Sequence, residues 1–211
     1  MRGAFITIEG IEGVGKTSSL AAIERHLGAR GLGTVVTREP GGTPFGERLR
    51  EQLLHGQHAE PIAPEAEALL MFAARAQHLA QVIVPALERG DWVVCDRFTD
   101  ATFAYQGGGR GVDRELLECL RTGVQKGLEP DLTLLLDAPV DVGRARIAGR
   151  EHDRFEREQA EFFERVRAAY LELAERNPRR IRRIDAAQPK EHVERQIEEA
   201  LGRFIEEWMA R

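Results

Sequence analysis

Residues 10–17 read Gly10-Ile11-Glu12-Gly13-Val14-Gly15-Lys16-Thr17, which fits the phosphate-loop pattern G-x-x-x-x-G-K-[ST] without a mismatch. Residues 4–8, just before them, are apolar and rich in β-branched side chains, as in a buried strand, and apolar residues recur at helical spacing over 20–27. This order lets backbone amides and a helix N-terminus surround an anion. The stretch therefore predicts a nucleotide phosphate site, with Lys16 at the β- and γ-phosphates and the Thr17 hydroxyl on Mg²⁺.

The composition indicates one domain with small-molecule ligands. The chain has 211 residues, 42% of them hydrophobic, which is enough to bury the core of a single domain spanning 1–211. Its net charge of −5 offers no basic field to a nucleic acid polymer. No apolar run approaches the ~18 residues of a membrane span, and the N-terminus reads as a strand rather than a signal peptide. Cys95 and Cys119 lack metal-ligand spacing. We therefore expect a cytoplasmic protein with no membrane or nucleic acid partner.

Short apolar runs alternate with longer helical patterns along the chain. Strands are expected at 4–8, 34–37, 92–95, 132–136 and 181–184. Helices are expected after the phosphate loop, near 99, and at 47–54, 64–89, 113–126, 162–173 and 193–208. Pro85 is expected to kink or break the long helix that begins at Pro64. The alternation predicts an α/β fold of the phosphate-loop NTPase type, with three α/β/α layers around a five-stranded, mainly parallel sheet.

Charged residues follow the strands where ligands of such folds bind, beyond the carboxyl ends. Arg38 follows the second strand and Arg97 follows the third. Because the phosphate loop already serves one nucleotide, these arginines suggest a second phosphate group. The alternative is that they are surface arginines paired with Glu39 or Asp96. Asp96 ends its strand as an acid that could hold Mg²⁺ directly or through water. Asp137, at the end of the next strand, is interpreted as a structural residue that caps the turn at Pro139.

Two helical stretches carry side chains suited to a planar base. Phe72 and Arg75 are three residues apart and share a helix face, so a ring could stack while a guanidinium donates to a base carbonyl. Taken alone, a phenylalanine at this spacing is more often a core residue. Thr102, Tyr105 and Gln106 share one face of the short helix expected near residue 99.

Two further segments are rich in glycine or arginine. Residues 107–111 read Gly-Gly-Gly-Arg-Gly, which we expect to be a loop able to approach a ligand closely. Residues 144–157 either form a solvated helix-loop-helix with local ion pairs or a lid that closes over a phosphoryl group. Their position after the fourth strand favours the lid. The arginines of this segment are Arg144, Arg146, Arg150, Arg154 and Arg157.

Together these motifs closely resemble the bacterial thymidylate kinase family. The matching segments are 8–17, Thr37-Arg38-Glu39-Pro40-Gly41-Gly42-Thr43, Leu70-Met71-Phe72-Ala73-Ala74-Arg75, Cys95-Asp96-Arg97, Ala104-Tyr105-Gln106-Gly107-Gly108-Gly109-Arg110-Gly111 and Ile184-Asp185-Ala186-Ala187-Gln188-Pro189. The resemblance covers essentially the whole chain, and the second and fifth segments are far more specific than a phosphate loop alone. It implies that ATP with Mg²⁺ phosphorylates dTMP to dTDP for dTTP biosynthesis, that residues 144–157 form a lid, and that the protein is a homodimer.

The resemblance also implies a role for each matching residue. The ATP-binding residues would be Gly10, Ile11, Glu12, Gly13, Val14, Gly15, Lys16, Thr17 and Gln188, the last beside the adenine. The metal would lie at Thr17 and Asp96. The substrate-binding residues would be Phe72 stacked on thymine, Arg75 at its O4 edge, Thr102 and Gln106 around the base, Tyr105 at the 2′ side of the sugar, Glu12 at the 3′-hydroxyl, and Arg38 and Arg97 at the acceptor phosphate. The catalytic set would be Lys16, Arg38 and Arg97 with a lid arginine.

The lid arginine is chosen by comparison within the family. Some relatives carry a catalytic arginine inside the phosphate loop, but residues 12–14 here read Glu-Gly-Val. The resemblance therefore implies an arginine from the lid. Arg150 is the first choice and Arg146 the second, and Arg154, in the Asp-Arg-Phe-Glu stretch, would anchor the lid instead.

Two other functions are considered. A kinase of another deoxynucleotide or of a deoxynucleoside is the nearest, and in a deoxynucleoside kinase Glu39 could activate the 5′-hydroxyl as a carboxylate base. Arg38 and Arg97 favour an acceptor that already carries phosphate. A GTP-binding switch protein typically contains an Asn-Lys-x-Asp stretch, and the sequence has none.

Overall fold

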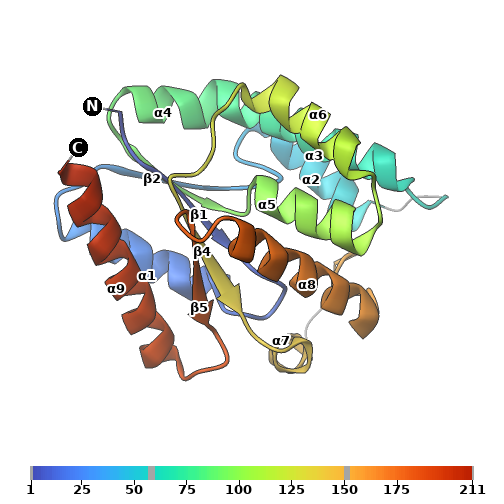
Figure 1. The fold of residues 1–211 in the computed structure, drawn as a ribbon. Helices are drawn as coiled ribbons and strands as arrows, with labels where there is room; N and C mark the ends of the chain where they lie inside the picture. The colour runs from blue at the N-terminus through green and yellow to red at the C-terminus, as the bar shows by residue number, and fades with distance from the viewer. Residues whose placement is uncertain (1, 57–59, 150–152, 211) are drawn as a thin grey trace.

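A single parallel sheet forms the centre of the protein. The computed structural model describes residues 2–56, 60–149 and 153–210. Its strands are β1 (Phe5–Glu9), β2 (Thr34–Arg38), β3 (Trp92–Asp96), β4 (Leu132–Asp137) and β5 (Ile181–Asp185). They pair in the order β2-β3-β1-β4-β5, and every pair is parallel (Figure 1). The predicted α/β class and the five-stranded parallel sheet are confirmed.

Helices cover both faces of this sheet, as Figure 1 shows. On one face, α1 (Lys16–Gly28) packs against α9 (Lys190–Met209). The other face carries α3 (Pro64–His78), η1 (Leu79–Ile83), α4 (Val84–Glu88), α5 (Thr99–Thr102), η2 (Phe103–Gly109), α6 (Arg114–Gln125) and α8 (Ala160–Arg176). The helix α2 (Pro44–His55) packs on α3, and α7 (Val140–Ile147) packs on α8.

The two-residue period of β1 divides its side chains between the layers. Ile6 and Ile8 join the core cluster that contains Ile23 of α1. Phe5 points the other way, into a second cluster with Ile83 of η1. All five side chains are fully buried. The sheet therefore has an apolar layer on both faces, which explains why its central strands read as nearly continuous hydrophobic runs.

The long helix behaves differently from the expectation at Pro85. The helix begins at Pro64 as predicted, but it does not break at Pro85. Its hydrogen bonding instead widens one turn earlier, into the π-helical turn Leu79–Ile83, and α4 then continues. A proline has no N–H to donate to the preceding turn, and a widened turn just before it accommodates the missing hydrogen bond.

The same stretch qualifies as a membrane span by composition. Pro64–Glu88 is 25 residues long and contains an 18-residue window with a mean hydropathy of 1.2, contrary to the expectation that no segment would reach that length. In the fold α4 packs on β3 and α3 packs on α6. Phe72, Arg75 and His78 of α3 are buried, and the two polar side chains both contact Glu39. These contacts are those of a core helix.

The glycine-rich segment is helical rather than a loop. Gly107, Gly108 and Gly109 lie in the π-helical η2, which packs closely on α8. A Cβ at Gly108 would lie 2.6 Å from the Cβ of Ala169, and one at Gly109 would lie 2.5 Å from the Phe162 ring. The predicted close approach is therefore made to a neighbouring helix, so the loop expectation was wrong for these three residues.

Candidate functional site

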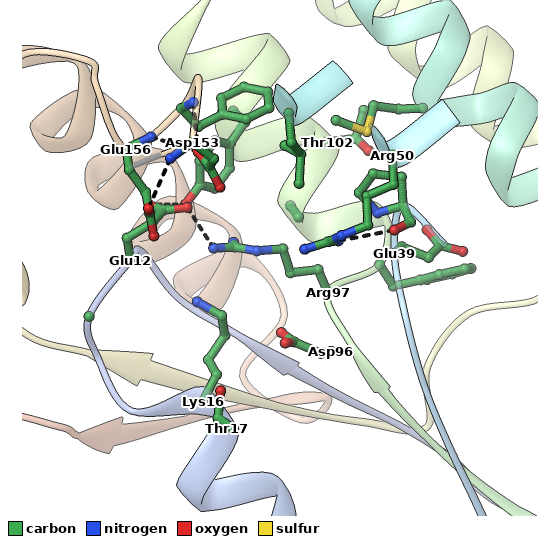
Figure 2. A pocket seen from close by; sticks show the side chains of 18 of the residues that line it. Glu12, Lys16, Thr17, Glu39, Arg50, Asp96, Arg97, Thr102, Asp153 and Glu156 are labelled. Carbon is green, nitrogen blue, oxygen red and sulfur yellow. Dashed lines mark hydrogen bonds and ion pairs between the residues drawn. The ribbon is translucent and has the colours of Figure 1, made fainter. Parts of the chain in front are cut away.

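A cavity of about 850 Å³ lies beyond the carboxyl ends of the strands. Figure 2 shows Lys16, Thr17 and Asp96 at one end of it, Glu39 and Thr102 at the other, and Arg97 between them. The described residues that line it come from the phosphate loop, the segments after β2 and β3, α2, α3, η2 and residues 146–156. Of the predicted site residues, it is lined by Glu12, Gly13, Gly15, Lys16, Thr17, Arg75, Asp96, Arg97, Thr102, Tyr105, Gln106 and Arg146.

The phosphate loop has the backbone geometry that its glycines allow. Gly10, Gly13 and Gly15 all have positive φ, at 137°, 75° and 93°. A Cβ at Gly13 would lie 2.0 Å from the Gly143 carbonyl oxygen, so only glycine fits there. The side chains of Ile11 and Val14 are buried in the core. These two positions can therefore serve a ligand only through their backbone.

Lys16 lies at the base of this loop, where two backbone carbonyls hold its amine. Its Nζ donates to the carbonyl oxygens of Ile11, at 2.8 Å, and Gly10, at 3.1 Å. Burial, and then the charge of Arg97, lower the pKa of Lys16 to about 8. The charges of Asp96, Glu12 and Glu9 oppose this lowering, and a phosphate group placed beside Lys16 would add further negative charge and raise the pKa again.

Arg97 is the centre of a charged cluster that contacts the phosphate loop directly. Its backbone is left-handed, with φ 67°, which a non-glycine residue adopts rarely. Its guanidinium donates to the Glu12 carboxylate at 2.9 Å, to the Gly10 carbonyl at 2.9 Å and to the Tyr170 hydroxyl at 3.2 Å. It also lies over the Tyr105 ring, 4.8 Å from the centroid. The side chain is therefore held rigidly at the cavity wall.

Glu12 and Tyr105 belong to the same cluster. The Tyr105 hydroxyl donates to both oxygens of Glu12, at 2.7 and 2.8 Å. Burial raises the pKa of Tyr105 well above its ordinary value, so the phenol stays protonated as a donor. The carboxylate, the phenol and the guanidinium of Arg97 thus fix one another.

Arg38 lies apart from this cluster. Its Nη2 donates to Glu47 of α2 at 2.8 Å, its side chain is 52% exposed, and it does not line the cavity. Arg97 pairs with Glu12. The sequence also allowed these two arginines to pair with Glu39 or Asp96. That alternative is wrong, because Arg38 pairs with Glu47 of α2 and Arg97 pairs with Glu12 of the phosphate loop.

Asp96 and Thr17, the predicted metal ligands, both line the cavity. The Oδ1 atom of Asp96 is buried and has no hydrogen-bond partner among the residues that the structure describes. A buried carboxylate oxygen left in this way indicates a missing cation or donor. No group of three potential ligands occurs among the described residues. Mg²⁺ is usually held by one or two carboxylates, with phosphates and waters completing its shell, so these two residues fit it.

The opposite end of the cavity carries a buried arginine. Arg75 donates from Nε to Glu39 at 2.8 Å and from Nη2 to Thr102 at 2.9 Å. Phe72 does not line the cavity: it lies in an apolar cluster of α3 and α6, and the Arg75 guanidinium stands over its ring at 4.7 Å. Gln106 lines the cavity, and its amide donates to the buried Glu67 at 2.7 Å.

The arginines after β4 have different partners. Arg146 lines the cavity and donates to the Ala186 carbonyl at 2.9 Å. Arg150, the first choice for a catalytic lid arginine, lies outside the described residues. Arg154 donates to the Leu53 carbonyl at 2.7 Å and to Glu67 at 2.5 Å.

Gln188 and Asp137 lie away from the cavity. Gln188 hydrogen-bonds Asp185 at 2.9 Å and borders a separate surface hollow. Asp137 forms ion pairs with Arg167 and Arg183, at 2.7 and 2.6 Å, and their hydrogen bonds hold the pKa of Asp137 below its ordinary value. Its interpretation as a structural residue fits these contacts, although its partners are side chains rather than a turn.

Several lining residues were not assigned a role from sequence. Arg50 of α2 reaches the cavity and donates to the Pro40 carbonyl at 3.0 Å. Burial, and then the Arg38 charge, lower its pKa. Met71, Asp153, Phe155 and Glu156 also line the cavity. The last three belong to the Asp-Arg-Phe-Glu stretch, and this motif was the sequence feature that could have identified them as site residues. Nothing in the sequence distinguished Arg50 from other arginines of an amphipathic helix.

Comparison with known proteins gives a consistent result. Residues 8–197 match the family model for thymidylate kinase. A protein named thymidylate kinase from Alkalilimnicola ehrlichii is 56% identical over 211 residues, covering 99% of this chain and 97% of the relative. One from Methylobacillus flagellatus is 55% identical over 205 residues, covering 97% and 99%.

Proposed function

The chain belongs to the thymidylate kinase family, and we propose that it transfers the γ-phosphoryl group of ATP to dTMP, giving dTDP and ADP for dTTP biosynthesis. One observation carries this proposal: the phosphate loop, Arg97 and Arg75 all line the same cavity. Arg97 is held by several hydrogen bonds, and Arg75 is buried with its Nη1 donor unpaired among the described residues. Those groups suit, in order, the donor phosphates, the acceptor phosphate and a base carbonyl.

We propose the following roles for residues that line the cavity and for Arg38, Phe72 and Gln188, which lie outside its lining. Residues 10–17 and Gln188 bind ATP. Thr17 and Asp96 hold Mg²⁺, which when bound neutralises phosphate charge. Lys16, Arg38, Arg97 and either Arg150 or Arg146 act on the phosphates during transfer. Glu12, Arg38, Phe72, Arg75, Arg97, Thr102, Tyr105 and Gln106 bind dTMP.

The chemistry needs electrostatics more than proton transfer. A phosphomonoester has a second pKa of about 6, so the acceptor is already a dianion near neutral pH. No general base is then required, and the main obstacle is bringing two anionic phosphates together in line. Lys16 and Arg97 both donate to the Gly10 carbonyl oxygen, at 3.1 and 2.9 Å, so two cations lie close together at the phosphate loop. There they can neutralise phosphate charge and fix the geometry of transfer.

The arrangement of Glu39 bears on the deoxynucleoside alternative. That alternative requires a carboxylate free to accept a proton from a 5′-hydroxyl. Both Glu39 oxygens are occupied, one by Arg75 at 2.8 Å and one by His78 at 3.0 Å. A carboxylate whose two oxygens already contact protein side chains is poorly placed to accept a proton from a substrate hydroxyl. This favours an acceptor that already carries phosphate.

A substrate comparison tests the proposal. ADP formation is measured with ATP and Mg²⁺ and with dTMP, thymidine, UMP or dGMP as the acceptor. We expect rapid turnover with dTMP, no turnover when Lys16→Ala replaces the wild-type protein, and little with the other acceptors. Brisk turnover of thymidine or dGMP with dTMP left unchanged would overturn the proposal. Binding of GTP in preference to ATP would favour a switch protein.

We further propose a cytoplasmic homodimer whose residues 144–157 close as a lid over bound ATP. We propose that the dimer contact lies on α3, because Leu69 of this helix is a large apolar side chain that is 50% exposed. Light scattering on the purified protein checks the mass, and Leu69→Glu is expected to yield monomers. A wild-type monomer at micromolar concentration would contradict the dimer.

A further inference from the structure

The guanidinium of Arg75 is fixed on every side but one. The side chain is 2% exposed, and its central carbon lies 4.7 Å from the Phe72 ring and 4.9 Å from the Phe98 ring. Its Nε and Nη2 atoms donate to Glu39 and Thr102. Its Nη1 atom is buried and has no hydrogen-bond partner among the described residues. A buried donor without a partner is unfavourable, and an acceptor on a ligand would remove that cost.

Glu39 is the counter-ion that sets this orientation. Its carboxylate is 5% exposed, and it directly follows β2 at the edge of the cavity. Its backbone N–H donates to the Asp96 carbonyl at 2.9 Å, which ties the residue to β3. One oxygen accepts from Arg75 Nε at 2.8 Å. The remaining oxygen needs a second donor, since a half-satisfied buried carboxylate would be free to rotate.

His78 supplies that donor from one turn further along α3. Its ring is fully buried, with Nδ1 3.0 Å from Glu39 Oε1 and Nε2 2.7 Å from Thr37 Oγ1. If Nδ1 carries the proton toward Glu39, the Thr37 hydroxyl donates to Nε2, so one neutral tautomer satisfies both contacts. Gly42, with φ 75°, closes over the ring: a Cβ there would lie 2.4 Å from His78 Nε2.

We propose that Glu39 and His78 are positioning residues for substrate selection, which hold Arg75 so that Nη1 donates to the carbonyl edge of the acceptor base. This inference rests on the proposed function. A base with a carbonyl at that edge accepts the hydrogen bond, whereas a base with an amino group there places a donor against a donor. The chain Thr37–His78–Glu39–Arg75 therefore sets both the affinity for dTMP and its preference over dCMP.

Two histidine variants separate positioning from simple stability. The amide nitrogen of asparagine lies about as far from the backbone as Nδ1, so His78→Asn keeps a donor for Glu39. The glutamine amide reaches the position of Nε2, so His78→Gln keeps the Thr37 contact and loses the Glu39 contact. Both replace an imidazole in the same buried space and are expected to lower thermal stability by a similar amount.

Steady-state kinetics with dTMP and dCMP provide the test. Loss of a hydrogen bond to a charged group changes affinity by roughly 10-fold or more. We expect His78→Gln and Glu39→Gln to raise KM for dTMP by at least that factor, leave KM for ATP within about 2-fold, and reduce the preference for dTMP over dCMP. His78→Asn is expected to remain near the wild-type values. Thr37→Val replaces a half-buried side chain by one of similar shape, so this variant is expected to fold. It should show the same pattern with a smaller change.

The outcomes distinguish this inference from the proposed function. A wild-type protein that leaves dTMP unchanged refutes the proposed function, whatever the variants do. A wild-type kinase whose Asn and Gln variants are equally impaired, or whose Thr37→Val variant keeps the full preference for dTMP over dCMP, overturns the positioning role. If His78→Gln does not fold, Thr37→Val and Glu39→Gln decide the question.

Discussion

Removing the Tyr170 hydroxyl is predicted to destabilise the protein in a pH-dependent way. In the fold, this hydroxyl donates to Glu9 Oε2 at 2.7 Å and accepts from Arg97 at 3.2 Å. Burial, and then the charge of Asp100, raise the pKa of Glu9 to about 7 from 4.5, while the hydrogen bond from Tyr170 opposes that rise. Tyr170→Phe keeps the ring and removes the hydrogen bond, so the pKa of Glu9 should rise further.

The sign follows from proton linkage. Because folded Glu9 binds its proton more tightly than the unfolded chain does, its contribution favours folding below about pH 4.5 and is lost as the pH rises through about 7. At about 1.4 kcal/mol per pH unit, that loss amounts to about 3 kcal/mol. The hydrogen bond from the Tyr170 hydroxyl contributes about 1.5–3 kcal/mol when Glu9 is ionised and about 1 kcal/mol when Glu9 is neutral. It therefore offsets part of the stability lost through Glu9 at high pH.

Urea unfolding at pH 5 and pH 8 measures this difference. We expect Tyr170→Phe to lower the free energy of unfolding by about 2 kcal/mol at pH 8 and by about 1 kcal/mol at pH 5. Tyr105→Phe is the matched control, because it removes a phenol that donates to Glu12 and does not touch Glu9. Its loss should be similar at both pH values. An equal loss at pH 5 and pH 8 for Tyr170→Phe would refute the assignment of the pH dependence to Glu9.

Three further predictions concern the loop, the lid and the helix packing. ATP binding near pH 8 should take up protons, because the phosphates restore the pKa of Lys16 from about 8, and calorimetry in two buffers of different ionisation heat should detect uptake in the wild type but not in Lys16→Met. Arg150→Ala should lower kcat roughly 10³-fold or more with little change in KM for ATP; an unaltered kcat in stopped assays would transfer the role to Arg146. Gly108→Ala should lower the free energy of unfolding by about 1–3 kcal/mol through overpacking, and adding Ala169→Gly should recover part of that loss in urea titrations, since the two Cβ atoms would otherwise lie 2.6 Å apart.

Local pattern was sufficient for much of the fold. The strands, the phosphate loop and the helix that begins at Pro64 lie where the sequence predicted them, because hydrophobic period, glycine spacing and helix N-terminal preferences are properties of short stretches. The errors occurred where neighbours decide conformation. Gly107–Gly109 form a π-helical turn because α8 packs against them, and the irregularity near Pro85 moved upstream into Leu79–Ile83.

The sequence by itself determined which chemical groups are present and at which strand ends they lie, since the carboxyl ends of parallel strands must meet at one edge of a sheet. Tertiary structure alone decided their partners. Arg97 pairs with Glu12 across 85 residues, Arg75 with Glu39 across 36, and Asp137 with Arg167 across 30. A charge in the sequence has many possible partners at such separations. Only the packing of elements that bury a side chain selects one of them, because a buried charge left unpaired costs more than the fold can tolerate.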